Sequence, residues 1–186
     1  MPDFAEGNVR IGEYNFNNLK LKYDIYKDDL LLLKTDGFIL LLNKEMIDTF
    51  SLVFDNEIFR FARFNDAPDN KPEGYANILF DSDIKIYVKY TKVIIPTQIT
   101  GGLPEYRNKN SVFILKDGRY HQIDARKDFL DLFDEQERKQ IKKFIRESLI
   151  KITVKDPVGF RRDLTQILLS LQKTGTVSTA LSWERL

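Results

Sequence analysis

The stretch from Leu19 to Leu42 constrains the fold more than any other part of the chain. Its first part, Leu19–Tyr26, alternates apolar and charged side chains, which is the pattern of a β-strand with one face on the core and one in water. Leu30–Leu33 and Phe38–Leu42 are continuous apolar runs, and Asp36-Gly37 between them supplies the positive backbone angles of a two-residue hairpin. We therefore predict three consecutive strands, the last two covered on both faces.

Short turns recur through the first half of the chain and favour antiparallel neighbours, because parallel strands need long crossovers. Asp55-Asn56 and Asp117-Gly118 are predicted hairpin turns. Residues 1–7 are interpreted as a loosely held lead-in and residues 14–18 as a polar bend, while residues 43–48 form either a helical turn or a loop. Residues 1–95 are then an antiparallel β-meander, and residues 96–110 a connecting loop, either a flexible linker or an ordered flap.

Residues 111–186 are predicted to form a β-hairpin followed by helices, because apolar residues recur at helical spacing only after Asp124. We predict that this part packs as one unit with residues 1–95. Asp134 and Glu137 have the spacing of a capping box, and Asp156-Pro157 is a typical helix start. We expect the apolar faces of these helices to cover the Leu30–Leu42 hairpin. The predicted fold class is α+β, mainly β, with about eight to ten strands in an open or barrel-like sheet and two to three C-terminal α-helices packed against it.

Composition excludes several classes of function. The 186 residues are 42% hydrophobic and 12% aromatic, as in a globular protein. Their 29 basic and 28 acidic residues nearly balance, so the chain has no large net positive charge with which to bind nucleic acid or an anionic membrane. The absence of cysteine excludes disulfides, thiolate nucleophiles and zinc-thiolate sites. No apolar run has membrane-spanning length and no leader is visible, which indicates either a cytoplasmic protein or one whose leader has been removed.

The residues that could carry chemistry do not form a recognisable catalytic set. His121 is the only histidine and has Asp124 nearby in sequence, but no serine sits in a nucleophile elbow, so a strand residue is the favoured interpretation. Two groups of acidic or amide side chains could supply calcium ligands or a carboxylate pair for glycoside cleavage, but a polar surface loop and a turn are the favoured interpretations, and the first group lacks the spacing of a calcium loop. These are Asp66, Asp69, Asn70 and Glu73 in the first group, and Asp81 and Asp83 in the second.

The remaining motifs favour structural roles. Gly101-Gly102 lacks the residues of a phosphate loop, and the basic pairs Lys142-Lys143 and Arg161-Arg162 are typical of solvated helix faces. Aromatic residues that might stack on bases or sugars are more simply core residues of strands. These are Phe59, Phe61, Tyr75, Tyr87 and Tyr90. We therefore assign no catalytic, cofactor-binding or metal-binding residue, and no cofactor.

Several segments together carry a resemblance to a known family. They are a Lys-Asp-Gly hairpin at Phe113–Tyr120, a short helix at Lys127–Phe133, a lysine-rich helix at Lys139–Ile145 and, more loosely, opening strands at Pro2–Val9 and Leu21–Tyr26. In these the chain resembles a family of uncharacterised extracytoplasmic proteins of the Bacteroidota. The resemblance implies a periplasmic or outer-membrane-associated location, with a cytoplasmic one as the alternative. It implies no activity and no catalytic residues.

Three functions from different classes follow. The first is a non-enzymatic envelope or periplasmic protein that acts through contacts with an as yet unknown protein partner, without nucleic acid. The second is a small-ligand-binding protein, because eight or more antiparallel strands are enough to close a barrel. The third is a carboxylate-based hydrolase that uses Asp81 and Asp83 or the loop from Asp66 to Glu73.

Overall fold

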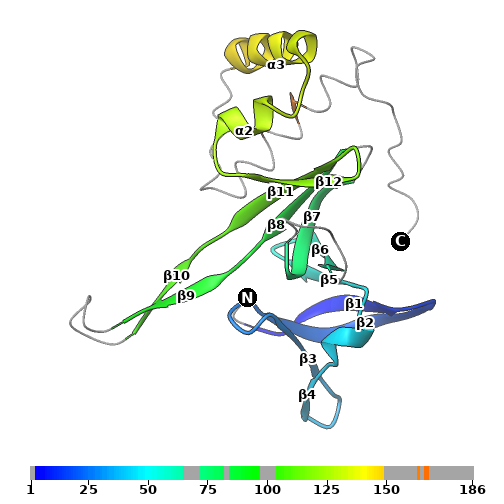
Figure 1. Cartoon of the computed structure of the whole chain (residues 1–186). Helices are drawn as coiled ribbons and strands as arrows, with labels where there is room; N and C mark the ends of the chain where they lie inside the picture. The colour runs from blue at the N-terminus through cyan, green and yellow to red at the C-terminus, as the bar shows by residue number, and fades with distance from the viewer. Residues whose placement is uncertain are drawn as a thin grey trace. The chain divides into compact units, whose positions relative to one another are not determined.

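The computed structural model describes residues 3–64, 72–81, 84–96 and 104–148, together with residues 163, 166 and 167. Its strands are β1 (Ala5–Ile11), β2 (Tyr14–Asp24), β3 (Asp29–Leu33), β4 (Ile39–Leu41), β5 (Thr49–Phe54), β6 (Glu57–Phe64), β7 (Gly74–Asp81), β8 (Lys85–Lys89), β9 (Lys92–Ile95), β10 (Glu105–Asn108), β11 (Ser111–Lys116) and β12 (Arg119–Ile123) (Figure 1). The helices are the 3-10 helix η1 (Lys44–Met46) and the α-helices α2 (Arg126–Leu130) and α3 (Glu135–Glu147).

The described strands confirm the predicted fold class. Ten of them form one antiparallel sheet in the order β12-β11-β8-β7-β6-β5-β1-β2-β3-β4, and β9 and β10 form a second sheet. The large sheet is open, because it ends at β12 on one side and at β4 on the other. The barrel-like alternative is therefore not what the described strands form.

The strand order departs from a simple meander at two points, because β5 lies beside β1 and β11 lies beside β8. After β4 the chain passes through η1 and returns to place β5 beside β1, where Gly7 pairs with Leu52 and Val9 with Phe50. β1 thus lies between β2 and β5 and has neighbours on both edges. This return interrupts the meander predicted for residues 1–95.

The described residues form two compact units. The first holds β1 to β6, the start of β7, and the β9–β10 pair, and the second holds most of β8 with β11, β12, α2 and α3. The core of the first unit is aromatic: the rings of Phe50 and Phe61 stack with centroids 4.5 Å apart, Tyr23 packs on both at a tilt, and Tyr75 packs edge-on against Phe50. Such ring pairs stabilise a core beyond the area that they bury.

The predicted turns have different outcomes. Asp55-Asn56 and Asp117-Gly118 both have two positive φ angles and close two-residue hairpins, as predicted. The Asp36-Gly37 turn is longer than predicted, because only Gly37 has positive φ and the Lys34 amide already bonds to the Phe38 carbonyl. The residues 43–48 contain one turn of 3-10 helix, η1.

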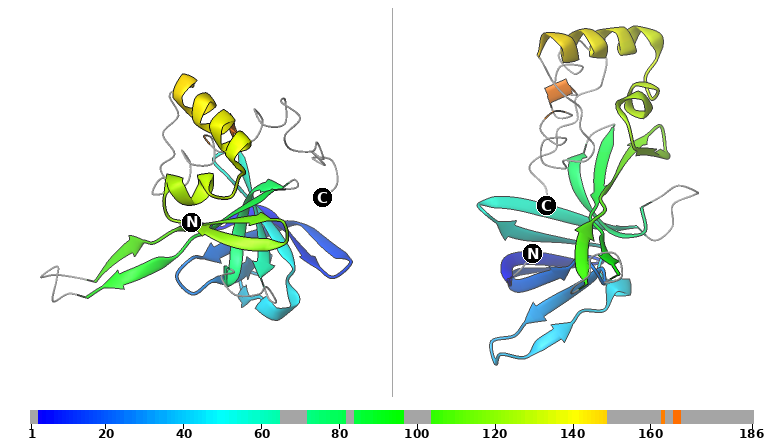
Figure 2. Two further views of the ribbon diagram at one scale, coloured as in Figure 1. Left: turned by 45° about the horizontal axis from the view of Figure 1, so that its top comes forward. Right: turned by 90° about the vertical axis from the view of Figure 1, so that its left-hand side faces the viewer.

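Two predicted loops contain strands instead. The polar bend predicted at residues 14–18 is the first part of β2, and the connecting loop predicted at residues 96–110 contains β10, which pairs with β9. Figure 2 shows β9 and β10 side by side. Residues 14–18 of β2 and the four residues of β10 are all exposed, so neither stretch has the buried apolar face that would mark it as a strand.

In the second unit the helix signals are confirmed. The Glu137 amide donates to Asp134 Oδ1 at 2.8 Å and the Asp134 amide to Glu137 Oε2 at 3.0 Å, which is the predicted capping box at the start of α3. Ile141 and Ile145 form the buried face of α3. The helix start predicted at Asp156-Pro157 lies outside the described residues. None of the described helices has the length and apolar character of a membrane span.

The prediction that the Leu30–Leu42 hairpin is covered on both faces is wrong for its second strand. Phe38, Ile39, Leu40 and Leu41 are 69%, 56%, 44% and 63% exposed. Leu30 is buried in the first unit's core, and Leu32 and Leu42 pack partly against it. These four residues, which lead into and form β4, are thus exposed in the part of the chain that the structure describes.

Candidate functional site

The structure does not bring His121 into a catalytic arrangement. It lies on β12, half-buried, and Asp124 accepts a hydrogen bond at 3.0 Å from Gln122 rather than from the imidazole. Among the described residues no group of three or more histidine or acidic side chains could hold a metal ion.

The acidic candidates are only partly described. Asp81 ends β7 and pairs with Lys85 at 2.8 Å, while its proposed partner Asp83 lies outside the described residues. Of the loop candidates Asp66, Asp69, Asn70 and Glu73, only Glu73 is described, and it is exposed. Gly101-Gly102 and Arg161-Arg162 also lie outside the described residues. The hydrolase hypothesis therefore stays a prediction.

Of the other singled-out residues, Lys142 and Lys143 are exposed on α3, and the aromatic residues pack in the protein. Phe61, Tyr75 and Tyr87 are buried, and Phe59 and Tyr90 pack partly against the first unit's core. None of these five rings presents an open stacking platform.

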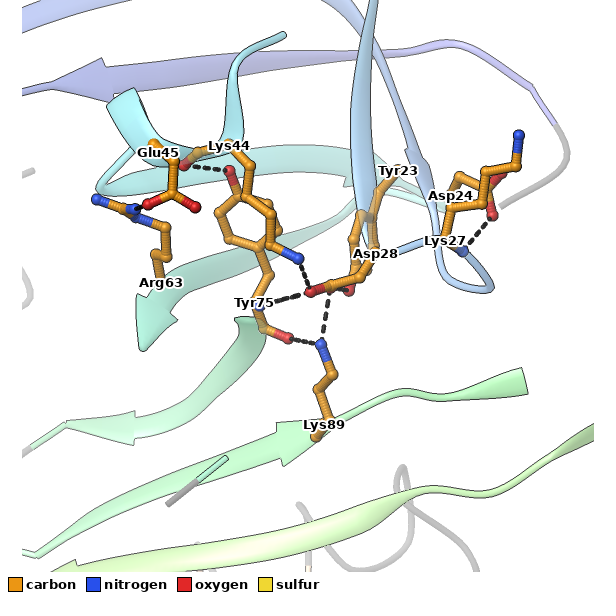
Figure 3. Close-up of polar contacts among 9 residues, drawn as sticks. All are labelled: Tyr23, Asp24, Lys27, Asp28, Lys44, Glu45, Arg63, Tyr75 and Lys89. Carbon is orange, nitrogen blue, oxygen red and sulfur yellow. Dashed lines mark hydrogen bonds and ion pairs between the residues drawn. The ribbon is translucent and has the colours of Figure 1, made fainter. Parts of the chain in front are cut away.

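A polar cluster that the sequence did not reveal surrounds Asp28, in the turn between β2 and β3 (Figure 3). We call Asp28 with Tyr23, Lys44, Tyr75 and Lys89 the Asp28 cluster. Asp28 Oδ1 accepts a hydrogen bond from the Tyr23 hydroxyl and lies 2.7 Å from Lys89 Nζ, and Oδ2 pairs with Lys44 Nζ. The Tyr75 amide lies 3.4 Å from Oδ1 and 3.3 Å from Oδ2.

The backbone around the Asp28 cluster is shaped to admit the carboxylate. Asp28 itself has φ +59°, and Gly74 has φ +72°. A Cβ atom at Gly74 would overlap Asp28 Oδ2, so glycine is required there for both its conformation and its size. Lys89 Nζ also donates to the Tyr75 carbonyl at 3.0 Å. The cluster thus joins the β2–β3 turn to η1, β7 and the end of β8.

This arrangement stabilises the fold and does not present a reactive carboxylate. Both Asp28 oxygens already accept bonds from protein donors, whereas a general base needs a free acceptor within reach of a substrate proton. The Tyr23 ring is fully buried, and burial, followed by the nearby charge of Asp28, raises the pKa of its hydroxyl far above the ordinary value. Burial lowers the pKa of Lys89, and the hydrogen bond to Asp28 opposes that shift.

The buried tyrosines predict loss of stability in alkali. Burial raises the pKa of Tyr23, Tyr75 and Tyr87 above the ordinary value of 10.0, so their stabilising contribution is complete below pH 10 and is lost as the pH rises above it. The contribution of Lys89 to stability changes with pH in the opposite direction, because the pKa of Lys89 is lowered in the folded state. The three tyrosines outnumber this single lysine. We therefore expect the free energy of unfolding to fall steadily above pH 10.

The measurement is a titration of tyrosinate absorbance alongside circular dichroism. Of the eight tyrosines, the buried Tyr23, Tyr75 and Tyr87 should ionise only as the dichroism signal is lost. Ionisation of all eight in one step with the fold intact would contradict the prediction.

The feature that best fits a functional surface is the segment Phe38, Ile39, Leu40 and Leu41, which we call the apolar edge. It belongs to β4, the last strand on one side of the large sheet. Proteins usually protect such edges with charges, prolines or bulges, because unpaired strands invite pairing with another chain. The opposite edge, β12, carries Arg119, His121 and Gln122, whereas the apolar edge carries no charge.

The hydrogen bonds of the β3–β4 hairpin define which backbone groups of the apolar edge are available. The Leu42 amide donates to Leu30 and the Phe38 carbonyl accepts from Lys34, so these residues direct their backbone groups toward β3. Directions alternate along an antiparallel strand. The N–H and C=O groups of Ile39 and Leu41 therefore point away from β3, where the described residues contain no further strand.

Comparison with protein-family models, with curated proteins and with solved structures found no match for this chain.

Proposed function

We propose that this protein has a non-enzymatic role and binds another protein through the apolar edge. The observation that carries the proposal is four consecutive large apolar side chains, all exposed, in and directly before the terminal strand β4. Exposed apolar surface of this kind is typical of interaction sites. Addition of a strand from the partner would use the outward backbone groups of Ile39 and Leu41 for affinity and the apolar side chains for specificity.

The partner segment is expected to be extended, apolar and uncharged. The nearest charges in the turn, Lys34 and Asp36, pair with each other at 2.7 Å, and Lys44 pairs with Asp28, so no free charge at the edge would compensate a charged partner residue. A second copy would meet the same chemistry, but a contact confined to these four residues on each copy is small beside the roughly 800 Å² that each partner buries in a standard interface. A different protein can extend its contact beyond β4.

A synthetic peptide tests this proposal directly. The probe is an extended peptide of alternating valine and threonine, compared with the same peptide N-methylated at alternate residues so that it cannot donate hydrogen bonds. The unmodified peptide should shift the amide NMR signals of Ile39 and Leu41 and slow their hydrogen exchange. Leu41→Lys should weaken binding about tenfold or more, because a charge at the edge opposes strand addition.

Ile58→Lys is the matched control, since Ile58 is an exposed apolar residue on β6. It should bind the peptide like the parent protein, and both variants should keep the parent's thermal stability. Equal binding of the N-methylated peptide, or of Leu41→Lys, would contradict the proposal. If sedimentation shows a concentration-dependent dimer that Leu41→Lys abolishes, the partner is a second copy of this chain and not a different protein.

We also propose an extracytoplasmic location, which is supported only by the resemblance to the Bacteroidota family. Fractionation of the native cell with an antibody against this chain tests it. Recovery in the periplasmic or outer-membrane fraction is expected, and recovery with the cytoplasm would contradict it.

A further inference from the structure

The second unit contains a surface groove between the β11–β12 hairpin and α2, with a volume of about 780 Å³. That volume is in the range of sites for small organic molecules. Basic side chains from the hairpin, Lys116, Arg119 and His121, line it, and Leu132 and Tyr120 add apolar surface. The groove also holds the only histidine of the chain.

The three acidic side chains of the groove are already engaged. Asp117 pairs with Lys116 at 2.8 Å, and Asp131 lies 3.5 Å from Arg138. Asp128 Oδ2 accepts the amides of Asp124 and Ala125 at 3.0 and 2.8 Å, which fixes the start of α2. The acids of the groove therefore have partners other than Arg119 and His121.

Arg119 and His121 are the side chains left to bind a ligand. Neither makes a side-chain hydrogen bond or ion pair with any part of the chain that the structure describes. They are two residues apart on β12, so they lie on the same face, roughly 7 Å apart along the strand. Lys116 is directly opposite Arg119 in the register and shares that face.

Arg119 and His121 therefore present N–H donors on one face at the turn end of the hairpin, and Lys116, which already pairs with Asp117, adds positive charge beside them. A guanidinium binds a carboxylate or phosphate through two parallel hydrogen bonds, and the neighbouring imidazole can donate a further one. The positive charge here also acts on the neighbouring carboxylate of Asp117. The hydrogen bond and charge of Lys116, and to a smaller extent the charge of His121, lower the pKa of Asp117.

We propose that this groove binds a small organic oxyanion, a carboxylate or phosphate ester with an apolar body. Arg119 holds the anionic group, with His121 beside it on the same face of the strand, and the apolar body lies against Leu132. This site is separate from the apolar edge and does not depend on the function proposed for it. It also differs from the barrel interior considered for a ligand from the sequence.

NMR titration of the full chain tests the proposal, because the single histidine gives one set of imidazole signals. The probes are phenyl phosphate, benzoate and inorganic phosphate at constant ionic strength. Phenyl phosphate or benzoate should shift the His121 ring and Arg119 Nε signals in a saturable way, and more tightly than inorganic phosphate. Arg119→Gln should raise the dissociation constant about tenfold or more, since it removes the bidentate donor.

Arg107→Gln is the matched control, because Arg107 is likewise an exposed arginine on a strand, β10, and does not line the groove. It should leave the dissociation constant unchanged. The proposal is overturned if no probe gives a saturable shift, or if Arg119→Gln and Arg107→Gln bind alike. Equal binding of inorganic phosphate and phenyl phosphate would overturn the assignment of an apolar body to the ligand.

Discussion

Replacing Asp28 with alanine is expected to lower the free energy of unfolding by about 3–5 kcal/mol, because it leaves partly buried charges without their counterion. Lys89 and Lys44 would both lose their carboxylate, and the Tyr23 hydroxyl would lose its acceptor within the core. Lys89 is the more affected lysine, since its side chain is only 16% exposed, against 32% for Lys44. Urea unfolding followed by fluorescence or circular dichroism measures the loss.

Two further variants make this expectation specific. Asp28→Asn keeps an acceptor oxygen but removes the charge, and should lose less stability than Asp28→Ala. Asp81→Ala breaks an exposed ion pair with Lys85 and should change the free energy of unfolding by less than about 1 kcal/mol. If Asp28→Ala and Asp81→Ala were equally stable, the Asp28 cluster would not stabilise the fold.

The Asp28 cluster also illustrates what the sequence could not predict. Asp28 follows Lys27 and precedes Asp29 in a hairpin turn, and a turn is a sufficient reason for aspartate there. Lys44 and Tyr75 lie 16 and 47 residues further along the chain, so no local spacing connects them to it. By contrast, the Asp134–Glu137 capping box and the Asp117-Gly118 turn were predictable, because their partners lie within three residues of each other.

The apolar edge shows a different limit. A continuous apolar run such as Phe38–Leu42 indicates that both faces of a strand are apolar. The prediction that helices of the same chain bury both faces follows from that pattern. The run is equally consistent with a partner outside the chain, which is the interpretation that the exposure of β4 favours. The pattern of apolar residues along a strand predicts which side chains are buried. It does not predict whether they are covered by the same chain or by another protein.

Gly7→Ala is expected to be the most damaging small substitution in β1, with a loss of about 3 kcal/mol in the free energy of unfolding. A Cβ atom at Gly7 would overlap the backbone carbonyl oxygen of Ser51 on β5 and would lie 3.1 Å from Leu21 Cδ1 on β2. Neither neighbour can move freely, because β1 is paired on both edges. No pattern in the sequence predicts this clash, and the prediction of a loosely held lead-in over residues 1–7 is wrong for Gly7, which lies in β1.

Gly12→Ala separates this packing effect from backbone conformation. Gly12 has φ +56° but nothing within 4 Å of an added Cβ, so its replacement should cost only about 1–2 kcal/mol from the left-handed backbone. Hydrogen exchange should show Gly7→Ala loosening the amides of β1 and β5 together, while Gly12→Ala affects only its own turn. If the two variants are equally stable, or if Gly7→Ala leaves hydrogen exchange in β5 unchanged, then β5 does not lie against β1. The placement of β5 beside β1 in the sheet would then be wrong.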